Sequence, residues 1–283
     1  MRTIRTEYYK MYHKSFEGRI SFFSDLHFSY NLPDNEMNQI LDYEYAINPD
    51  YIVITGDLVD SLDVLVDDNE KYCFLSFLKN LSMIAPLYVS FGNHDFYGNG
   101  SYSFRNYKKD LVLYSNVGVL DNKKITTSNF NIAGISMTEK DCASKAAFKR
   151  RLLAYNDVLK TYSDKLNILL THSPKFILDS DIYDLISSFD YVFSGHLHNG
   201  SIPGYMNFIP GTIGLIGPYK DIFPINSRNT YKKEGDKLIV TGAVRTFHTM
   251  SGFEFLNSLY PIQNVVLDFD SDKKVYKKVF YER

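Results

Sequence analysis

Residues 19–27 read RISFFSDLH, a short apolar run that ends directly in an acid and a histidine. Two later stretches repeat this arrangement, YIVITGDLVD at residues 51–60 and LYVSFGNHD at residues 87–95. Short apolar runs bounded by turn residues predict buried strands. Because ligand sites in open α/β sheets form beyond the carboxyl ends of strands, the three polar blocks are expected to meet at one edge of a sheet.

Two further polar blocks follow predicted strands over residues 167–171 and 191–194. They read THSP at residues 171–174 and GHLH at residues 195–198, and with the first three blocks they hold five of the chain's seven histidines. Carboxylate oxygens and imidazole nitrogens together suit manganese, iron, cobalt, nickel or zinc rather than calcium. The five blocks therefore predict a transition-metal site.

Two pairs of candidate ligands are spaced two residues apart, Asp25 with His27 and His196 with His198. On an extended segment such residues point the same way, so each pair is expected to face one site. Glycines open three of the blocks, and they are expected to permit tight turns and close approach of the backbone.

The stretches between the blocks alternate between helical and strand patterns. Helical spacing predicts helices over residues 35–47, 70–81, 102–114 and 144–160. Further strands are expected over residues 4–11 (an edge strand), 117–120, 124–127, 131–136, 237–244, 262–268 and 275–280, with the three between 117 and 136 paired antiparallel. Strand–helix alternation followed by a strand-rich C-terminal half favours an α/β fold with mixed sheets.

The bulk composition limits the class of protein. A chain of 283 residues with 45% hydrophobic content can bury a substantial core. A net charge of −2 gives no global basic field and so disfavours non-specific nucleic-acid binding. A local basic groove on the surface remains an alternative. Cys73 and Cys142 are too few for a disulfide framework and are expected to be reduced, packed thiols. Without a secretory leader or an apolar run of about 18 residues, a cytoplasmic protein with no transmembrane segment is expected.

The ordered series D-x-H, G-D-x-x-D, G-N-H-D, T-H-x-P and G-H-x-H, between residues 25 and 198, resembles the calcineurin-like metallophosphoesterase superfamily. The resemblance implies a four-layer αββα sandwich of two mixed β-sheets flanked by helices. It also implies a single metallophosphoesterase domain over residues 1–283, with a dinuclear metal site at one edge of the sheets.

The resemblance also implies the metal ligands. Seven positions match, three for each of two ions and one between them: Asp25, His27 and His198; Asn93, His172 and His196; and Asp57 as the bridge. The implied cofactors are two divalent transition-metal ions (Mn, Fe, Zn or Ni, with Mn favoured) and a bridging hydroxide. Such a pair polarises a phosphoryl oxygen and supports in-line attack on phosphorus.

Two residues beside the ligands are implied to be catalytic. His94 would lie outside the metal shell, stabilise the charge that develops at phosphorus and protonate the leaving oxygen. Asp95 would orient the His94 ring and favour its charged form. Asp60 is expected to serve in a turn or to support a ligand, rather than to bind metal itself.

The blocks also narrow the substrate class. Protein phosphatases of this superfamily carry Arg-Gly after the second acid of the G-D block and Glu after G-N-H, whereas this chain has Ser61-Leu62 and Asp95. The likeness is greater to bacterial phosphodiesterase-like members, although Asn-Gly-Ser at residues 199–201 replaces their usual Gly-Gly-Gln. We therefore expect a phosphodiesterase that acts on a small-molecule or lipid phosphoester, and leave its oligomeric state open.

Two loops are candidates for substrate contact. The stretch after the G-N-H-D block offers Tyr97 and Arg105, and the stretch after G-H-x-H offers Tyr205. These side chains could form an aromatic rim around a base or an acyl chain, or they could be ordinary surface residues.

Two alternative functions stay open. A nuclease of the same superfamily shares G-N-H-D but usually adds a capping domain and basic character. A non-catalytic metal-binding scaffold usually lacks a ligand or the catalytic histidine, and this chain keeps all eight residues.

Overall fold

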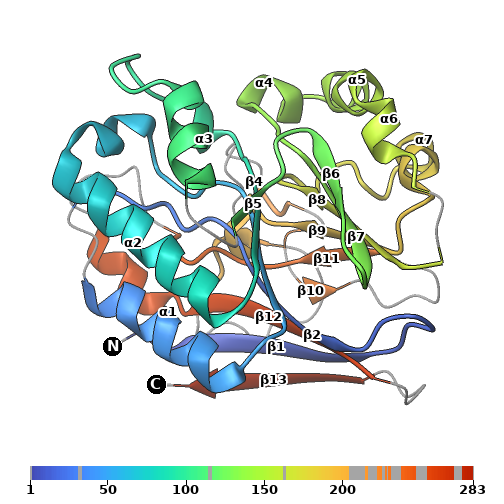
Figure 1. Ribbon diagram of the computed structural model, residues 1–283, viewed down its shortest axis with the longest axis horizontal. Helices are drawn as coiled ribbons and strands as arrows, with labels where there is room; N and C mark the ends of the chain where they lie inside the picture. The colour runs from blue at the N-terminus through green and yellow to red at the C-terminus, as the bar shows by residue number, and fades with distance from the viewer. Residues whose placement is uncertain are drawn as a thin grey trace.

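The computed structural model describes residues 2–30, 34–113, 117–161, 164–203, 214–215, 222–224, 227, 229–230, 237–246, 254–270 and 276–282. Two β-sheets pack face to face, and helices cover the outer face of each sheet (Figure 1). This arrangement confirms the predicted four-layer αββα sandwich.

The first sheet has seven strands among the described residues, in the order β13-β1-β12-β2-β3-β4-β5. Their bounds are β1 (Ile4–Met11), β2 (Gly18–Phe23), β3 (Tyr51–Thr55), β4 (Leu87–Ser90), β5 (Val117–Val119), β12 (Ile262–Phe269) and β13 (Tyr276–Glu282). Strands β2, β3, β4 and β5 run parallel, whereas β12 pairs antiparallel with β2. Because β2, β3 and β4 are parallel neighbours, the three blocks that follow them leave the sheet at the same edge.

The second sheet has six strands in the part of the chain that the structure describes, in the order β10-β11-β9-β8-β7-β6. Their bounds are β6 (Lys123–Thr126), β7 (Phe130–Ile135), β8 (Leu166–Thr171), β9 (Tyr191–Ser194), β10 (Asn229–Thr230) and β11 (Leu238–Val240). Strands β7, β8 and β9 are parallel neighbours, so the two later histidine blocks also share one edge.

Helices α1 (Asp34–Ile47), α2 (Asp68–Ile84) and α3 (Phe104–Val112) lie outside the first sheet (Figure 1). The shorter helices α4 (Glu139–Cys142), α5 (Lys145–Ala154), α6 (Asn156–Leu159) and α7 (Ser180–Tyr183) lie outside the second sheet. Short 3₁₀ segments connect several elements: η1 (Leu62–Val66), η2 (His94–Phe96), η3 (Asp184–Ile186), η4 (His198–Ser201) and η6 (Glu254–Leu259).

Apolar residues that follow one another in a strand serve different core layers. Phe22 and Val53 face the layer between the sheets, where Phe22 stacks on Phe193 with ring centroids 4.9 Å apart. Phe23 and Ile54 face the layer beneath α1 and α2. A strand buried on both faces is apolar at most positions, which explains the apolar runs before the polar blocks.

The structure corrects three expectations about the elements. Strand β1 is not an edge strand, because β13 pairs with its outer side. Within this strand, Glu7 is buried in ion pairs with Arg5 (2.7 Å) and Lys277 (2.6 Å). Strand β5 joins the first sheet beside β4, so it is not antiparallel to β6. The helix expected over residues 144–160 is broken at Tyr155, whose φ of −122° and ψ of 33° interrupt helical geometry.

Neither of the two cysteines is in a disulfide bond, and only Cys142 is packed as expected. Cys73 is exposed on the outer surface of α2, so the expectation of a packed thiol is wrong at that position. Among the described residues no helix combines the length and apolarity needed to cross a membrane.

One carboxyl group lies inside the layer between α1 and the first sheet. Glu44 is 0% exposed, and its Oε1 accepts hydrogen bonds from Ser21 Oγ (2.7 Å) and Asn264 Nδ2 (3.1 Å). Its Oε2 has no hydrogen-bond partner among the described residues. Burial outweighs the two hydrogen bonds and raises the pKa of Glu44 to about 8.

This carboxyl group makes stability depend on pH. The unfolded chain ionises Glu44 near its ordinary pKa of 4.5, whereas the folded chain keeps the proton up to about pH 8. The free energy of unfolding should therefore fall by roughly 1.4 kcal/mol per pH unit across this window. Urea denaturation at pH 5 and pH 8 should show this loss in the wild type and much less of it in Glu44→Gln. An unchanged slope in Glu44→Gln would refute the prediction.

Candidate metal centre

The loops after β2 and β3 are joined by backbone hydrogen bonds. Asp25 N donates to Gly56 O (3.1 Å), and His27 N donates to Asp57 O (3.0 Å). Asp25, His27 and Asp57 all have left-handed backbones, with φ of 55°, 44° and 50°. The expectation that Asp25 and His27 share an extended segment is therefore wrong, and the same holds for His196 (φ 66°) and His198 (φ 47°). Tight turns direct these side chains to one place.

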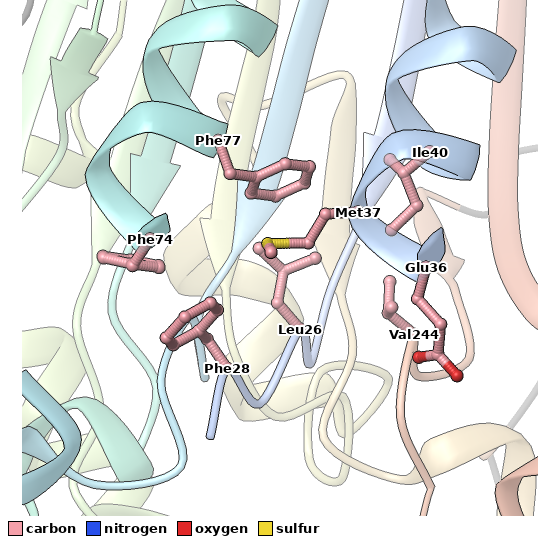
Figure 2. A pocket seen from close by; sticks show the side chains of 8 residues that line it. All are labelled: Leu26, Phe28, Glu36, Met37, Ile40, Phe74, Phe77 and Val244. Atoms are coloured by element: carbon pink, nitrogen blue, oxygen red, sulfur yellow. The ribbon is translucent and has the colours of Figure 1, made fainter. Parts of the chain in front are cut away.

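Apolar side chains between the ligands anchor the loop after β2. Leu26 and Phe28 alternate with Asp25 and His27, and both point into an apolar pocket between α1 and α2 (Figure 2). The pocket is lined by Leu26, Phe28, Glu36, Met37, Ile40, Phe74, Phe77 and Val244. Because Leu26 and Phe28 are held in the core, the polar side chains of the same loop are fixed on the opposite side.

The side chains of the predicted ligands converge in two groups, and a third group of His27, Asp57 and His94 shares one residue with each of them. Asp25, His27 and His198 each place one ligand atom within 4.8 Å of the others, and so do Asp57, His172 and His196. His198 Nε2 lies 3.2 Å from His27 Nε2 and 3.3 Å from Asp25 Oδ1. His172 Nε2 lies 3.0 Å from Asp57 Oδ2 and 3.1 Å from His196 Nδ1.

One carboxylate lies between the two groups. Asp57 Oδ2 is 3.0 Å from His172 Nε2 in the second group and 3.7 Å from His27 Nε2 in the first. Its other oxygen accepts a hydrogen bond from the backbone nitrogen of His94 (2.8 Å). Asp57 is therefore in the position that a shared ligand would need.

The burial of this cluster and the chemistry of its donor atoms suit divalent cations. Asp25, His27 and His172 are 0% exposed, and Asp57 is 1% exposed. The buried Asn93 Oδ1 has no hydrogen-bond donor among the described residues, as expected for an oxygen reserved for a cation. Two buried carboxylates beside four imidazoles form a mixed oxygen and nitrogen set, which suits first-row transition metals.

Backbone carbonyls fix the orientation of two histidine rings. His172 Nδ1 lies 2.8 Å from Thr55 O, and His198 Nδ1 lies 3.3 Å from Thr246 O. An Nδ1–H that donates to a carbonyl leaves Nε2 unprotonated and directed at the cluster, which is the form that binds metal.

Two glycines are required by the close packing of these loops. A Cβ on Gly92 would lie 2.3 Å from Asp57 Oδ1 and 2.7 Å from the His172 ring. A Cβ on Gly195 would lie 1.9 Å from Ser24 Oγ and 2.3 Å from Asp25 Oδ2. Any side chain at either position would displace a candidate ligand or its support.

Asp60, rather than Asp95, holds the ring of His94. His94 Nδ1 lies 2.8 Å from Asp60 O and 3.3 Å from Asp60 Oδ1, while the ring meets that of His27 edge-on at 4.7 Å between centroids. Burial alone would lower the pKa of His94, but Asp60 and the charge of Asp57 raise it to about 9. The protonated form of the His94 ring is thus favoured as expected, but the acid that favours it is Asp60 and not Asp95.

Asp95 instead supports the loops from beneath. Its carboxylate is 0% exposed and accepts hydrogen bonds from Gly92 N (2.9 Å), Leu58 N (3.0 Å) and the Tyr107 hydroxyl (3.2 Å). Successive residues of a 3₁₀ turn point about 120° apart, so the residue after His94 is directed into the core. The prediction that Asp95 orients His94 is wrong for this reason.

The family is decided by comparison with known proteins. Residues 18–200 match the family model for calcineurin-like phosphoesterases. This chain belongs to the calcineurin-like phosphoesterase family. The match covers all five polar blocks, and the resemblance seen in the sequence is confirmed.

Individual relatives of this calcineurin-like phosphoesterase are distant. An uncharacterised metallophosphoesterase of Campylobacter jejuni is 28% identical over 208 residues, covering 72% of this chain and 50% of the relative. An uncharacterised metallophosphoesterase of Bacillus subtilis is 25% identical, covering 66% of this chain and 60% of the relative. The chain thus spans about half to three fifths of the length of these relatives.

A solved structure shares the fold of the phosphoesterase over nearly its whole length. A dimetal phosphatase from Danio rerio aligns with a TM-score of 0.51 at 10% identity, covering 95% of this chain and 98% of that chain. At this identity the likeness shows the fold alone.

The three expected substrate contacts have different outcomes. Tyr97 lies beside the cluster, with its ring centroid 4.7 Å from that of His94. Arg105 is exposed on α3, and nothing described places it at the cluster. Tyr205 lies outside the described residues. Sequence reasoning missed Glu139, because no motif surrounds it; its carboxylate accepts a hydrogen bond from the Tyr97 hydroxyl (2.8 Å).

Proposed function

We propose that this chain is a metal-dependent phosphohydrolase and, more specifically, a phosphodiesterase. The observation that carries the proposal is the convergence of all five polar blocks on one buried cluster beside His94. Family membership supports the general chemistry, and the missing Arg-Gly and Glu signatures argue against a protein substrate.

The proposed ligands are those that the motifs imply. Asp25, His27 and His198 would hold one ion, Asn93, His172 and His196 would hold the other, and Asp57 would bind both. Two divalent ions bound there would polarise a phosphoryl oxygen and lower the pKa of a bound water. We propose manganese first among Mn, Fe, Zn and Ni; the mixed set of three oxygen and four nitrogen donors suits first-row transition metals in general.

His94 would act on the leaving group. Its Nδ1 is held by Asp60, so Nε2 is the atom available to donate a proton to the departing oxygen. The carboxylate of Asp60, 3.3 Å from Nδ1, favours the protonated ring, as a general acid requires. In the same charged form the ring would stabilise negative charge on the phosphoryl oxygens.

The substrate class is proposed from the sequence motifs and from the position of Tyr97 beside His94. We propose a small-molecule or lipid phosphoester in a cytoplasmic setting, with the Tyr97 ring contacting the group attached to phosphorus. Arg105 and Tyr205 remain proposed contacts on the basis of the sequence alone.

The proposal predicts that manganese-reconstituted protein hydrolyses bis(p-nitrophenyl) phosphate and does so faster than p-nitrophenyl phosphate. Release of p-nitrophenol measures both rates, and addition of a chelator should abolish them. Folded protein with two bound metal ions that cleaved neither ester would refute a phosphohydrolase. Preferential, metal-dependent degradation of DNA or RNA would instead identify a nuclease.

A further inference from the structure

The amide of Asn93 poses an orientation problem. A side-chain amide has an oxygen that can bind a cation and an NH₂ group that cannot, and the two ends have nearly the same shape. The Asn93 side chain presents Oδ1 as a buried atom without a hydrogen-bond donor among the described residues. Something must hold the opposite end, because a reversed amide would present two N–H donors to the ion.

A hydrogen-bond chain holds that end. Asn93 Nδ2 donates to the Tyr97 hydroxyl (3.3 Å), and this hydroxyl donates its own proton to Glu139 Oε2 (2.8 Å). An ionised carboxylate only accepts hydrogen bonds, so Glu139 sets the direction of the chain. The Tyr97 oxygen is thereby left to accept from Asn93, and the amide nitrogen must point toward it.

These two hydrogen bonds connect the two halves of the molecule. Tyr97 follows the turn η2 after β4 in the first sheet, whereas Glu139 begins α4 after β7 in the second sheet. A capping box fixes the start of α4, since Asp141 Oδ2 accepts from Thr138 N (2.9 Å) and Thr138 Oγ1 (2.7 Å). Glu139 is therefore presented from a defined backbone position, although its side chain is exposed.

We propose that Tyr97 and Glu139 are positioning residues that orient the Asn93 amide so that its oxygen faces the metal site. The inference rests on the proposed metal centre and adds two residues that the family motifs do not contain. Partners of this kind fix a ligand before the ion arrives, and their loss typically weakens metal binding by 10- to 100-fold. They act through Asn93, so the first effect of losing them is on metal affinity.

The test is a titration of Tyr97→Phe with manganese. Calorimetry measures the two affinities, and electron paramagnetic resonance shows whether the two ions are coupled. Wild type should bind two Mn²⁺ ions and give the spectrum of an exchange-coupled pair. Tyr97→Phe should bind one ion normally and the second roughly tenfold more weakly, with a mononuclear spectrum at limiting metal. Glu139→Ala should lose less affinity, because water can replace an exposed acceptor.

Two comparisons separate positioning from general damage. The first is Tyr102→Phe, which removes another tyrosine hydroxyl in the same stretch of chain, one that donates to Asp110. This variant should bind manganese like wild type. Glu139→Gln keeps an acceptor oxygen and should lie between Glu139→Ala and wild type. The double variant of Tyr97→Phe and Glu139→Ala should be no worse than Tyr97→Phe alone, because both residues act along one path.

The results distinguish a failure of the positioning role from a failure of the metal centre itself. Two unchanged affinities and an unchanged coupled spectrum in Tyr97→Phe would overturn the positioning role while leaving the metal centre intact. Fully additive losses in the double variant would contradict a shared path. Wild-type protein that binds no manganese would overturn the metal centre and this inference together.

Discussion

Replacing His94 by alanine is expected to slow phosphodiester hydrolysis by roughly 10²- to 10⁴-fold, while both metal ions stay bound. The imidazole lies at the edge of the cluster, and Asp60 holds it at Nδ1 (2.8 Å to the carbonyl). The methyl group of alanine can neither donate a proton nor stabilise charge at phosphorus. The backbone nitrogen of residue 94 still donates to Asp57, so the loop and the ligands should persist.

The leaving group provides the sharpest form of this test. p-Nitrophenolate departs without a proton, whereas an alkoxide needs one. The defect of His94→Ala should therefore be much larger for an alkyl phosphodiester than for bis(p-nitrophenyl) phosphate. The control is His13→Ala, which removes a histidine that pairs with Asp190 (3.7 Å) away from the cluster, and this variant should keep full activity. Equal defects on both esters would contradict proton donation by His94.

Changing Asp57 to asparagine is expected to remove the second metal ion and to lower activity by more than about 10²-fold. Replacing a residue that only supports a metal ligand already lowers metal affinity or activity by up to about that factor. The carboxylate lies 3.0 Å from His172 Nε2 and 3.7 Å from His27 Nε2, between the two ligand groups. Asparagine keeps one oxygen to accept from His94 N but supplies no charge to balance two cations. Elemental analysis after gel filtration measures the loss.

A matched variant controls for the change of an acid to an amide. Asp63 lies in η1 of the same connection, where its Oδ1 accepts from Asn99 N (2.8 Å). Asp63→Asn should keep two metal ions and wild-type activity. If Asp57→Asn also kept two tightly bound ions, Asp57 could not be the bridge.

The positions of the strands and of the ligand blocks could be predicted because both follow from local pattern. Apolar runs such as residues 51–55 need burial on both faces, and parallel neighbours bring their ends to one edge. The five blocks therefore met as predicted. A single domain over residues 1–283 and a cytoplasmic location stay predictions.

Features set by backbone conformation and by distant partners could not be predicted. Spacing of two residues suggested an extended pair at Asp25 and His27, but left-handed turns place these side chains together. The acid adjacent to His94 in sequence suggested Asp95 as its partner, whereas the 3₁₀ turn directs Asp95 into the core. No local pattern joins Tyr97 to Glu139, since the contact crosses between the two sheets.

The five polar blocks are proposed to bind two metal ions through seven named ligands. Crystals grown with manganese, measured near its absorption edge, test this proposal directly. We expect two anomalous peaks roughly 3.5–4 Å apart, with Asp57 in contact with both ions and Asn93 in contact with one. A single peak, peaks elsewhere on the protein, or none at this cluster would contradict it.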